Sequence, residues 1–217
     1  NEYMCMEVAR RAGMDVPEFW LSEDGSLFIM KRFDIRDGQQ LGLEDMVVLM
    51  GKSPEEKYHG SYENIAKAVD IFCGGNAIES KARLFEYIAL SCLLKNGDAH
   101  LKNFSLLYNY PAGNVSLSPL YDVVTTTIYE IENPRTGATK VDNTMALNLK
   151  KSKAYPLEDD LMEFGKSICL VRNPRQVIER IEAMKHEVYA DLKDRIDPWL
   201  SARLKKAWGI AITGYRH

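Results

Sequence analysis

The sequence lacks the features that mark several common classes of protein. No apolar run approaches the ~20 residues that a membrane-spanning helix needs, and the start of the chain does not resemble a secretory signal. The formal net charge is −3, which argues against the overall basic surface of an autonomous nucleic-acid binder. We therefore expect a cytoplasmic protein without a membrane partner. Its four cysteines fit reduced thiols and include no pair at zinc-ligand spacing: Cys5, Cys73, Cys92 and Cys169.

The composition is that of one folded unit. Of the 217 residues, 46% are hydrophobic and 27% are charged, so the chain can bury a substantial core. It contains no internal repeat, low-complexity tract or long linker. We therefore predict a single domain over residues 1–217.

The main functional signal is a set of three polar residues. Asp98 is followed five positions later by Asn103, and Asp122 comes about twenty residues further on. One carboxylate can accept the proton of an attacking hydroxyl, while an amide oxygen and a second carboxylate can hold the Mg²⁺ that neutralises nucleotide phosphates. An Asp and an Asn at this spacing also occur in ordinary solvated turns, so their context has to decide.

The context favours phosphoryl transfer. An apolar helical run over residues 84–94 leads into Asn96-Gly97, which ends the helix. Strand-like segments at 104–108 and 114–117 follow, and the second leads to Asp122. A helix, a polar loop, a hairpin and a metal-binding carboxylate occur in this order in protein-kinase folds.

The other segments are predicted mainly as helices. A helix over residues 2–12 precedes a hairpin over 20–34 that turns at Asp24-Gly25. Gly74-Gly75-Asn76 is expected to stop a helix and not to cradle phosphate, because it follows a helix and lacks a P-loop lysine. Strands are expected at 125–127 and 144–149, and helices at 44–50, 62–72, 161–170, 174–193 and 198–212.

Several ordered motifs resemble the HipA-like serine/threonine kinase toxins of bacterial toxin–antitoxin systems. The resemblance runs from residue 1 to about residue 149 and more loosely to the end. It is carried by Asn1-Glu2-Tyr3-Met4-Cys5, Lys31-Arg32-Phe33-Asp34, Leu43-Glu44-Asp45-Met46, Lys57-Tyr58-His59-Gly60-Ser61-Tyr62, Asp98-Ala99-His100-Leu101-Lys102-Asn103-Phe104 and Pro119-Leu120-Tyr121-Asp122.

The resemblance implies an α+β protein-kinase-like fold that is mainly the helical C-lobe with a hinge hairpin. Residues 1–34 would be a remnant of the N-lobe helix and the hinge, and residues 35–217 the helical C-lobe. The loop that covers the phosphates and the strand lysine of kinases do not precede residue 1, so most of the N-lobe is expected to be missing. Glu2 stands where the partner of that lysine would be, although a first-turn glutamate also suits any helix N-terminus.

The resemblance also implies roles at the site. Asp98 would be the catalytic base, and Asn103 and Asp122 the Mg²⁺ ligands. The backbone of Lys31 and Phe33 would contact the adenine of ATP.

Three further residues would complete the nucleotide site. Asp34 would approach the ribose. Lys102 can reach the transferring phosphoryl group and stabilise its charge. His100 is grouped with the nucleotide site, where we expect it to orient the loop through a backbone hydrogen bond. Without the resemblance, Phe33 would be interpreted as a packing aromatic and Asp34 as the start of a turn.

Three functions remain open from the sequence. The resemblance favours an ATP- and Mg²⁺-dependent protein kinase toxin with a protein substrate in translation, such as an aminoacyl-tRNA synthetase. Its antitoxin partner would make any DNA contact indirect. The first alternative is a small-molecule phosphotransferase of the aminoglycoside or choline kinase type, although Asn96 replaces the first His of their HGDxHxxN loop. The second is a non-catalytic module with a kinase fold that docks a partner.

Overall fold

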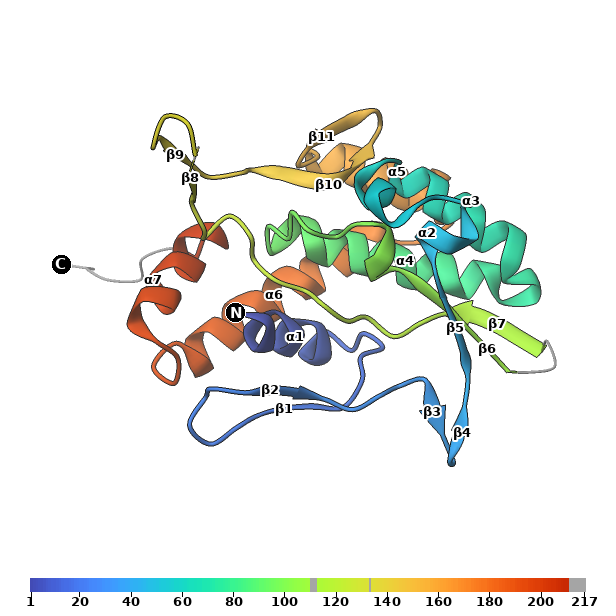
Figure 1. Ribbon diagram of the computed structural model, residues 1–217, viewed down its shortest axis with the longest axis horizontal. Helices are drawn as coiled ribbons and strands as arrows, with labels where there is room; N and C mark the ends of the chain where they lie inside the picture. The colour runs from blue at the N-terminus through green and yellow to red at the C-terminus, as the bar shows by residue number, and fades with distance from the viewer. Residues whose placement is uncertain (110–112, 133, 211–217) are drawn as a thin grey trace.

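Helix α4 (Ala77–Leu93) lies at the centre of the molecule (Figure 1). The computed structural model describes residues 1–109, 113–132 and 134–210. Helices α3 (Tyr62–Phe72), α5 (Glu158–Ser167) and α6 (Pro174–Leu192) pack against α4, and α1 (Glu2–Arg11) packs against α6. Mixed helices and small sheets of this kind confirm the predicted α+β class with a dominant helical lobe.

Small antiparallel sheets lie around this helical body (Figure 1). The three-stranded sheet has the order β5-β6-β7, and its strands β6 and β7 follow the polar loop and lead toward Asp122. The paired strands are β1 (Phe19–Leu21) with β2 (Phe28–Met30), β3 (Ile35–Arg36) with β4 (Gln39–Gln40), β5 (Gly42–Asp45) with β6 (Ser105–Asn109), β6 with β7 (Gly113–Leu117), β8 (Ile131–Glu132) with β9 (Thr139–Lys140), and β10 (Thr144–Leu149) with β11 (Ser152–Ala154).

Local sequence signals explain most helix starts. Ser61 accepts a hydrogen bond from the backbone N–H of Asn64 at the start of α3, and the Asn64 side chain bonds back to the Ser61 backbone in a capping box. Pro174 occupies the first turn of α6, where a missing N–H is harmless. Pro198 does the same in α7 (Pro198–Ala207). These helices and the β1–β2 hairpin were correctly predicted to within a few residues, except that α7 ends earlier than expected and residues 211–212 lie outside the described part.

Two predicted elements were wrong. Residues 44–50 were expected to be helical, but the segment begins as strand β5 and only then forms the short helix α2 (Met46–Leu49). Backbone pairing of β5 with β6 overrides local helix propensity up to Asp45, whose side chain then caps α2 by accepting the Val48 N–H at 3.0 Å. Residues 125–127 are not a strand, because the polar groups of Thr125 and Thr126 bond to other segments.

The contacts of these threonines tie three parts of the chain together. Thr125 donates its N–H to the side chain of Asn1 at 3.0 Å, and its hydroxyl accepts the indole N–H of Trp208 at 2.8 Å. Thr125 and Trp208 are 0% and 2% exposed. The segment after Asp122 is therefore fixed against both α1 and the C-terminal helical region.

All four cysteines are buried and unpaired. Burial raises the pKa of Cys5 to about 11 and that of Cys92 to about 12, so both thiols stay protonated at neutral pH. In the part of the chain that the structure describes, no helix is long and apolar enough to cross a membrane.

We predict that Phe85→Ala lowers the free energy of unfolding by about 3–5 kcal/mol. Phe85 is 0% exposed on α4 and packs against Gly165 of α5, where a Cβ would come within 2.7 Å of the ring. Removing the ring leaves a cavity between these two helices. Chemical denaturation measures the loss, and Ile71→Ala, at a side chain that is 65% exposed, should change stability by no more than about 0.5 kcal/mol. Equal effects would contradict this packing.

Candidate functional site

Side chains hold the polar loop in place where α4 ends. Lys95 has a φ of 57°, which turns the backbone out of the helix. The buried Asn96 accepts the N–H of Asp98 at 3.0 Å, and Gly97 donates its N–H to the Thr126 hydroxyl at 2.8 Å. These bonds replace the helical hydrogen bonds that the loop has lost, which fixes its path.

Asn103 and Asp122 lie side by side. The Asn103 amide donates to Oδ2 of Asp122 at 2.6 Å, and its Oδ1 accepts the N–H of His100 at 2.9 Å. Asp122 has a φ of 57°, a left-handed conformation that is uncommon for aspartate and turns the chain just after Tyr121. The structure thus brings together the two residues that were predicted as metal ligands.

The donor chemistry of this pair fits Mg²⁺. An amide oxygen and a carboxylate are hard oxygen ligands, and Oδ1 of Asp122 makes no hydrogen bond to a described residue. Among the described residues, no cluster of three His, Cys, Asp or Glu side chains could hold a metal alone. Mg²⁺ is commonly bound by one or two protein ligands together with phosphate oxygens and water, so the pair suits a metal that arrives with a nucleotide.

Tyr121 connects this pair to the predicted hinge, residues 31–34. Its hydroxyl donates to the Lys102 carbonyl at 2.9 Å and also bonds to the Ser105 hydroxyl at 2.7 Å. Its ring stacks on Phe33, with 5.4 Å between centroids. Burial raises the pKa of Tyr121 to about 12, so it remains a hydroxyl donor. Phe33 of the predicted hinge therefore packs against Tyr121, the residue that precedes Asp122.

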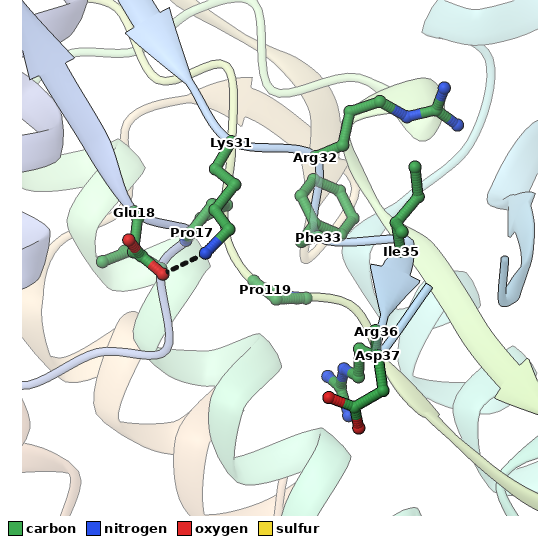
Figure 2. A pocket seen from close by; sticks show the side chains of 10 residues that line it. Pro17, Glu18, Lys31, Arg32, Phe33, Ile35, Arg36, Asp37 and Pro119 are labelled. Atoms are coloured by element: carbon green, nitrogen blue, oxygen red, sulfur yellow. Dashed lines mark hydrogen bonds and ion pairs between the residues drawn. The ribbon is translucent and has the colours of Figure 1, made fainter. Parts of the chain in front are cut away.

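The hinge side chains border a pocket of about 510 Å³ (Figure 2). Lys31 reaches across to Glu18, with 2.7 Å between Nζ and Oε1, while Phe33 and Pro119 form other parts of the wall. Asp98, Asn103 and Asp122 do not line this pocket. This pocket is therefore distinct from the surroundings of the predicted base and of the predicted metal ligands.

Asp34 forms an ion pair with Arg32. Arg32 binds both carboxylate oxygens, at 3.0 and 2.5 Å, and this bond holds the pKa of Asp34 below its usual value. Asp34 is 9% exposed and does not line the hinge pocket. Its predicted role at a ribose would require one of its oxygens to accept a further hydrogen bond.

Asp98 lines a second pocket, of about 480 Å³, together with Thr126, Tyr129 and Asp142. It is half-buried, and its Oδ1 accepts the hydroxyl hydrogen of Tyr58 at 2.7 Å. Lys102 is exposed, so its ammonium group can move toward a phosphate.

His100 is buried, near enough to Asp98 and Asp122 to feel the charges of both. Its backbone N–H bonds Asn103, and Nδ1 of its ring has no hydrogen-bond partner among the described residues. Burial lowers the pKa of His100, while the charges of Asp98 and Asp122 act in the opposite direction. The imidazole is thus mainly neutral at pH 7. Its predicted role of orienting the loop through a hydrogen bond to the backbone stays a prediction.

Glu2 approaches the same region from α1. Burial raises the pKa of Glu2, and the negative charge of Asp122 raises it further. Glu2, in the first turn of α1, is therefore close enough to Asp122 for their charges to repel each other.

Sequence reasoning assigned no role to three residues that shape the site: Tyr58, Tyr121 and Thr126. Tyr58 and Tyr121 occur in the quoted motifs, but only the fold shows that their hydroxyls bond to the loop. Thr126 was placed in a strand. No local pattern indicates that its hydroxyl receives the N–H of Gly97, 29 residues away.

The order of these parts defines a kinase-like protein. A central helix, a loop with Asp98 and Asn103, the β6–β7 hairpin and Asp122 follow one another as in protein-kinase folds. Residues 1–192 match the model of the HipA-like C-terminal domain. The chain belongs to this family.

Relatives in sequence are named as kinases. Putative kinase Y4dM of Sinorhizobium fredii is 30% identical over 206 residues, which are 85% of this chain and 47% of that protein. A putative kinase of Haemophilus influenzae is 30% identical over 198 residues, which are 80% of this chain and 56% of that protein. The chain thus spans about half the length of the curated relatives it matches, and the likeness supports a kinase-like function.

Two solved structures share the fold. HipA of Shewanella oneidensis MR-1, in a toxin–antitoxin complex with HipB and operator DNA, has a TM-score of 0.71 at 18% identity, covering 98% of this chain and 58% of that chain. The proinflammatory kinase CtkA of Helicobacter pylori has a TM-score of 0.63 at 16% identity, covering 96% of this chain and 76% of that chain.

We predict that Gly97→Ala distorts the loop and lowers the free energy of unfolding by about 1–3 kcal/mol. A Cβ at Gly97 would lie 2.6 Å from the Thr144 carbonyl and 2.7 Å from the Thr126 hydroxyl. Gly75→Ala is the matched control, because nothing lies within 4 Å of its Cβ. Urea denaturation of both variants tests this, and equal stability of the two would show that the loop tolerates the methyl group.

Proposed function

We propose that this protein is an ATP- and Mg²⁺-dependent serine/threonine protein kinase and the toxin of a bacterial toxin–antitoxin pair. The observation that carries the proposal is the contact of Asn103 with Asp122 beside a loop that presents Asp98. This combination supplies a base and a metal site together. The family membership and the named kinases among its relatives support the same class of reaction.

Each side chain has a defined task in the proposed reaction. Asp98 accepts the proton of the acceptor hydroxyl as that oxygen attacks the γ-phosphorus. Asn103 and Asp122 would hold Mg²⁺, which would neutralise charge on the phosphates. Lys102 stabilises the charge that develops on the transferred group.

The hinge has the task of holding the nucleotide. Backbone groups of Lys31 and Phe33 can bind the donor and acceptor edge of adenine whatever their side chains are. Asp34 would accept a ribose hydroxyl. Phe33 stacks on Tyr121, which precedes Asp122. Adenine bound at Phe33 would therefore be linked to Asp122 through this pair of rings.

The antitoxin and the substrate belong to the proposal as well. HipA of Shewanella oneidensis, which shares the fold, was solved with HipB and operator DNA. By this analogy we propose an antitoxin partner through which the protein reaches DNA indirectly. The substrate would be a protein of the translation machinery, such as an aminoacyl-tRNA synthetase.

We expect Asp98→Ala and Asp122→Ala to fail at different steps. Asp98→Ala should leave Mg-ATP binding within about twofold and lower transfer by about 10²–10⁴-fold, because a base acts only when the proton moves. Asp122→Ala should remove the Mg²⁺ dependence of binding. Calorimetry with and without Mg²⁺ measures binding, and transfer of labelled γ-phosphate to bacterial lysate proteins measures activity, both in the full-length protein.

The outcomes separate the candidate functions. A labelled protein band that disappears in Asp98→Ala supports a protein kinase. ATP binding without any labelled protein would instead favour a small-molecule phosphotransferase. If the wild-type protein neither binds ATP nor transfers phosphate, a binding module is favoured. Normal turnover by Asp98→Ala and Asp122→Ala would reject the assigned roles.

A further inference from the structure

Tyr58 is the one described residue whose side chain forms a hydrogen bond with the carboxylate of Asp98. It ends the short 3-10 helix Pro54–Tyr58, 40 residues before the loop. Its hydroxyl donates to Oδ1 of Asp98 at 2.7 Å. A segment outside the loop thus contacts the proposed base directly.

The other hydrogen bonds to Asp98 and the residues next to it hold backbone groups of the loop. Asn96 and Thr126 bind the N–H groups of Asp98 and Gly97, and Tyr62 donates to the Ala99 carbonyl at 3.1 Å. None of these bonds restricts rotation about the side-chain torsions of Asp98. Among the described residues, Tyr58 thus supplies the hydrogen bond that can orient the carboxylate.

Tyr58 is itself held on several sides. Its ring meets the edge of His100, with 5.1 Å between centroids, and the Lys57 ammonium lies 4.9 Å from its centroid. Lys153 donates to the Tyr58 carbonyl at 3.3 Å. Partial desolvation of the Tyr58 side chain and its hydrogen bond to Asp98 raise the pKa of Tyr58 to about 12, so it donates a hydrogen throughout the neutral range.

The hydrogen bond between Tyr58 and Asp98 lies at the wall of a pocket. Tyr58 and Asp98 both line it, with Thr126 and Asp142 among the other lining residues. Because Tyr58 occupies Oδ1, the second oxygen of Asp98 is left to accept a proton. An acceptor hydroxyl that enters this pocket can meet that oxygen.

We propose that Tyr58 is a positioning residue that holds the Asp98 carboxylate toward an acceptor hydroxyl in this pocket. The inference rests on the proposed kinase function. In the transfer step, the acceptor oxygen bonds to the γ-phosphorus while the bond from that phosphorus to the departing ADP oxygen breaks. The acceptor proton passes to Oδ2 of Asp98, and Tyr58 keeps its own proton.

Tyr58→Phe tests the inference because it removes only the hydroxyl. In the full-length protein, with Mg-ATP and the protein band labelled in a bacterial lysate as probe, we expect turnover to fall about 10- to 100-fold, as for a misplaced catalytic group. The Kd for Mg-ATP and the KM for ATP should stay within about twofold. Tyr189→Phe is the matched control, since it removes a hydroxyl that bonds Ser201 away from the site.

A second background separates positioning from a general structural effect. In Asp98→Asn the base is already lost, so adding Tyr58→Phe should cost no further activity. An equal loss in both backgrounds would show that Tyr58 acts independently of Asp98. Unchanged or faster turnover of Tyr58→Phe, with wild-type transfer intact and Asp98→Ala inactive, would overturn the inference while sustaining the kinase. Absence of transfer by the wild type would reject the proposed function itself.

Discussion

The hydrogen bond between Asn103 and Asp122 closes the loop after α4 onto the segment that follows the β6–β7 hairpin. Two parts of the chain 19 residues apart meet there, and Asp122 has a left-handed backbone conformation at the contact. The hairpin determines how far apart they lie, and the hydroxyl of Tyr121 bonds the Lys102 carbonyl alongside. Without this hydrogen bond, the amide oxygen of Asn103 and the carboxylate of Asp122 would not lie side by side, and the proposed metal site would not form.

Burying a polar loop is costly unless each group finds a partner, and the fold supplies partners from distant segments. An unsatisfied buried donor or acceptor costs about 1–3 kcal/mol, whereas one satisfied hydrogen bond contributes about 0.5–1.5 kcal/mol. The Thr126 hydroxyl accepts the backbone N–H of Gly97, and the Tyr58 hydroxyl donates to the carboxylate of Asp98. Thr125 links the same segment to Asn1 and Trp208. Residues from several elements of the fold therefore hydrogen-bond to the site and its neighbouring segment.

Much of this arrangement could be predicted from sequence because it follows local rules. Helix α3 has a capping box, α6 and α7 have first-turn prolines, and the apolar run of α4 predicts a helix before the loop. The kinase-like order of elements is also visible in the motifs. The strand at residues 42–45 was missed because its pairing with β6 is not a local property. The contacts of Tyr58 and Thr126 were missed for the same reason, since each joins residues 29 or more positions apart. The roles of the predicted site residues remain predictions, although the structure places Asp98, His100, Asn103 and Asp122 together.

The position of the metal tests this view of the site most directly. A crystal structure of the full-length protein with Mn²⁺ and a non-hydrolysable ATP analogue would locate the metal by its anomalous signal. We expect the peak within coordination distance of the side-chain oxygens of Asn103 and Asp122, with phosphate oxygens completing the sphere. A metal bound by the nucleotide elsewhere, with the Asn103–Asp122 hydrogen bond unchanged, would contradict the proposed kinase site.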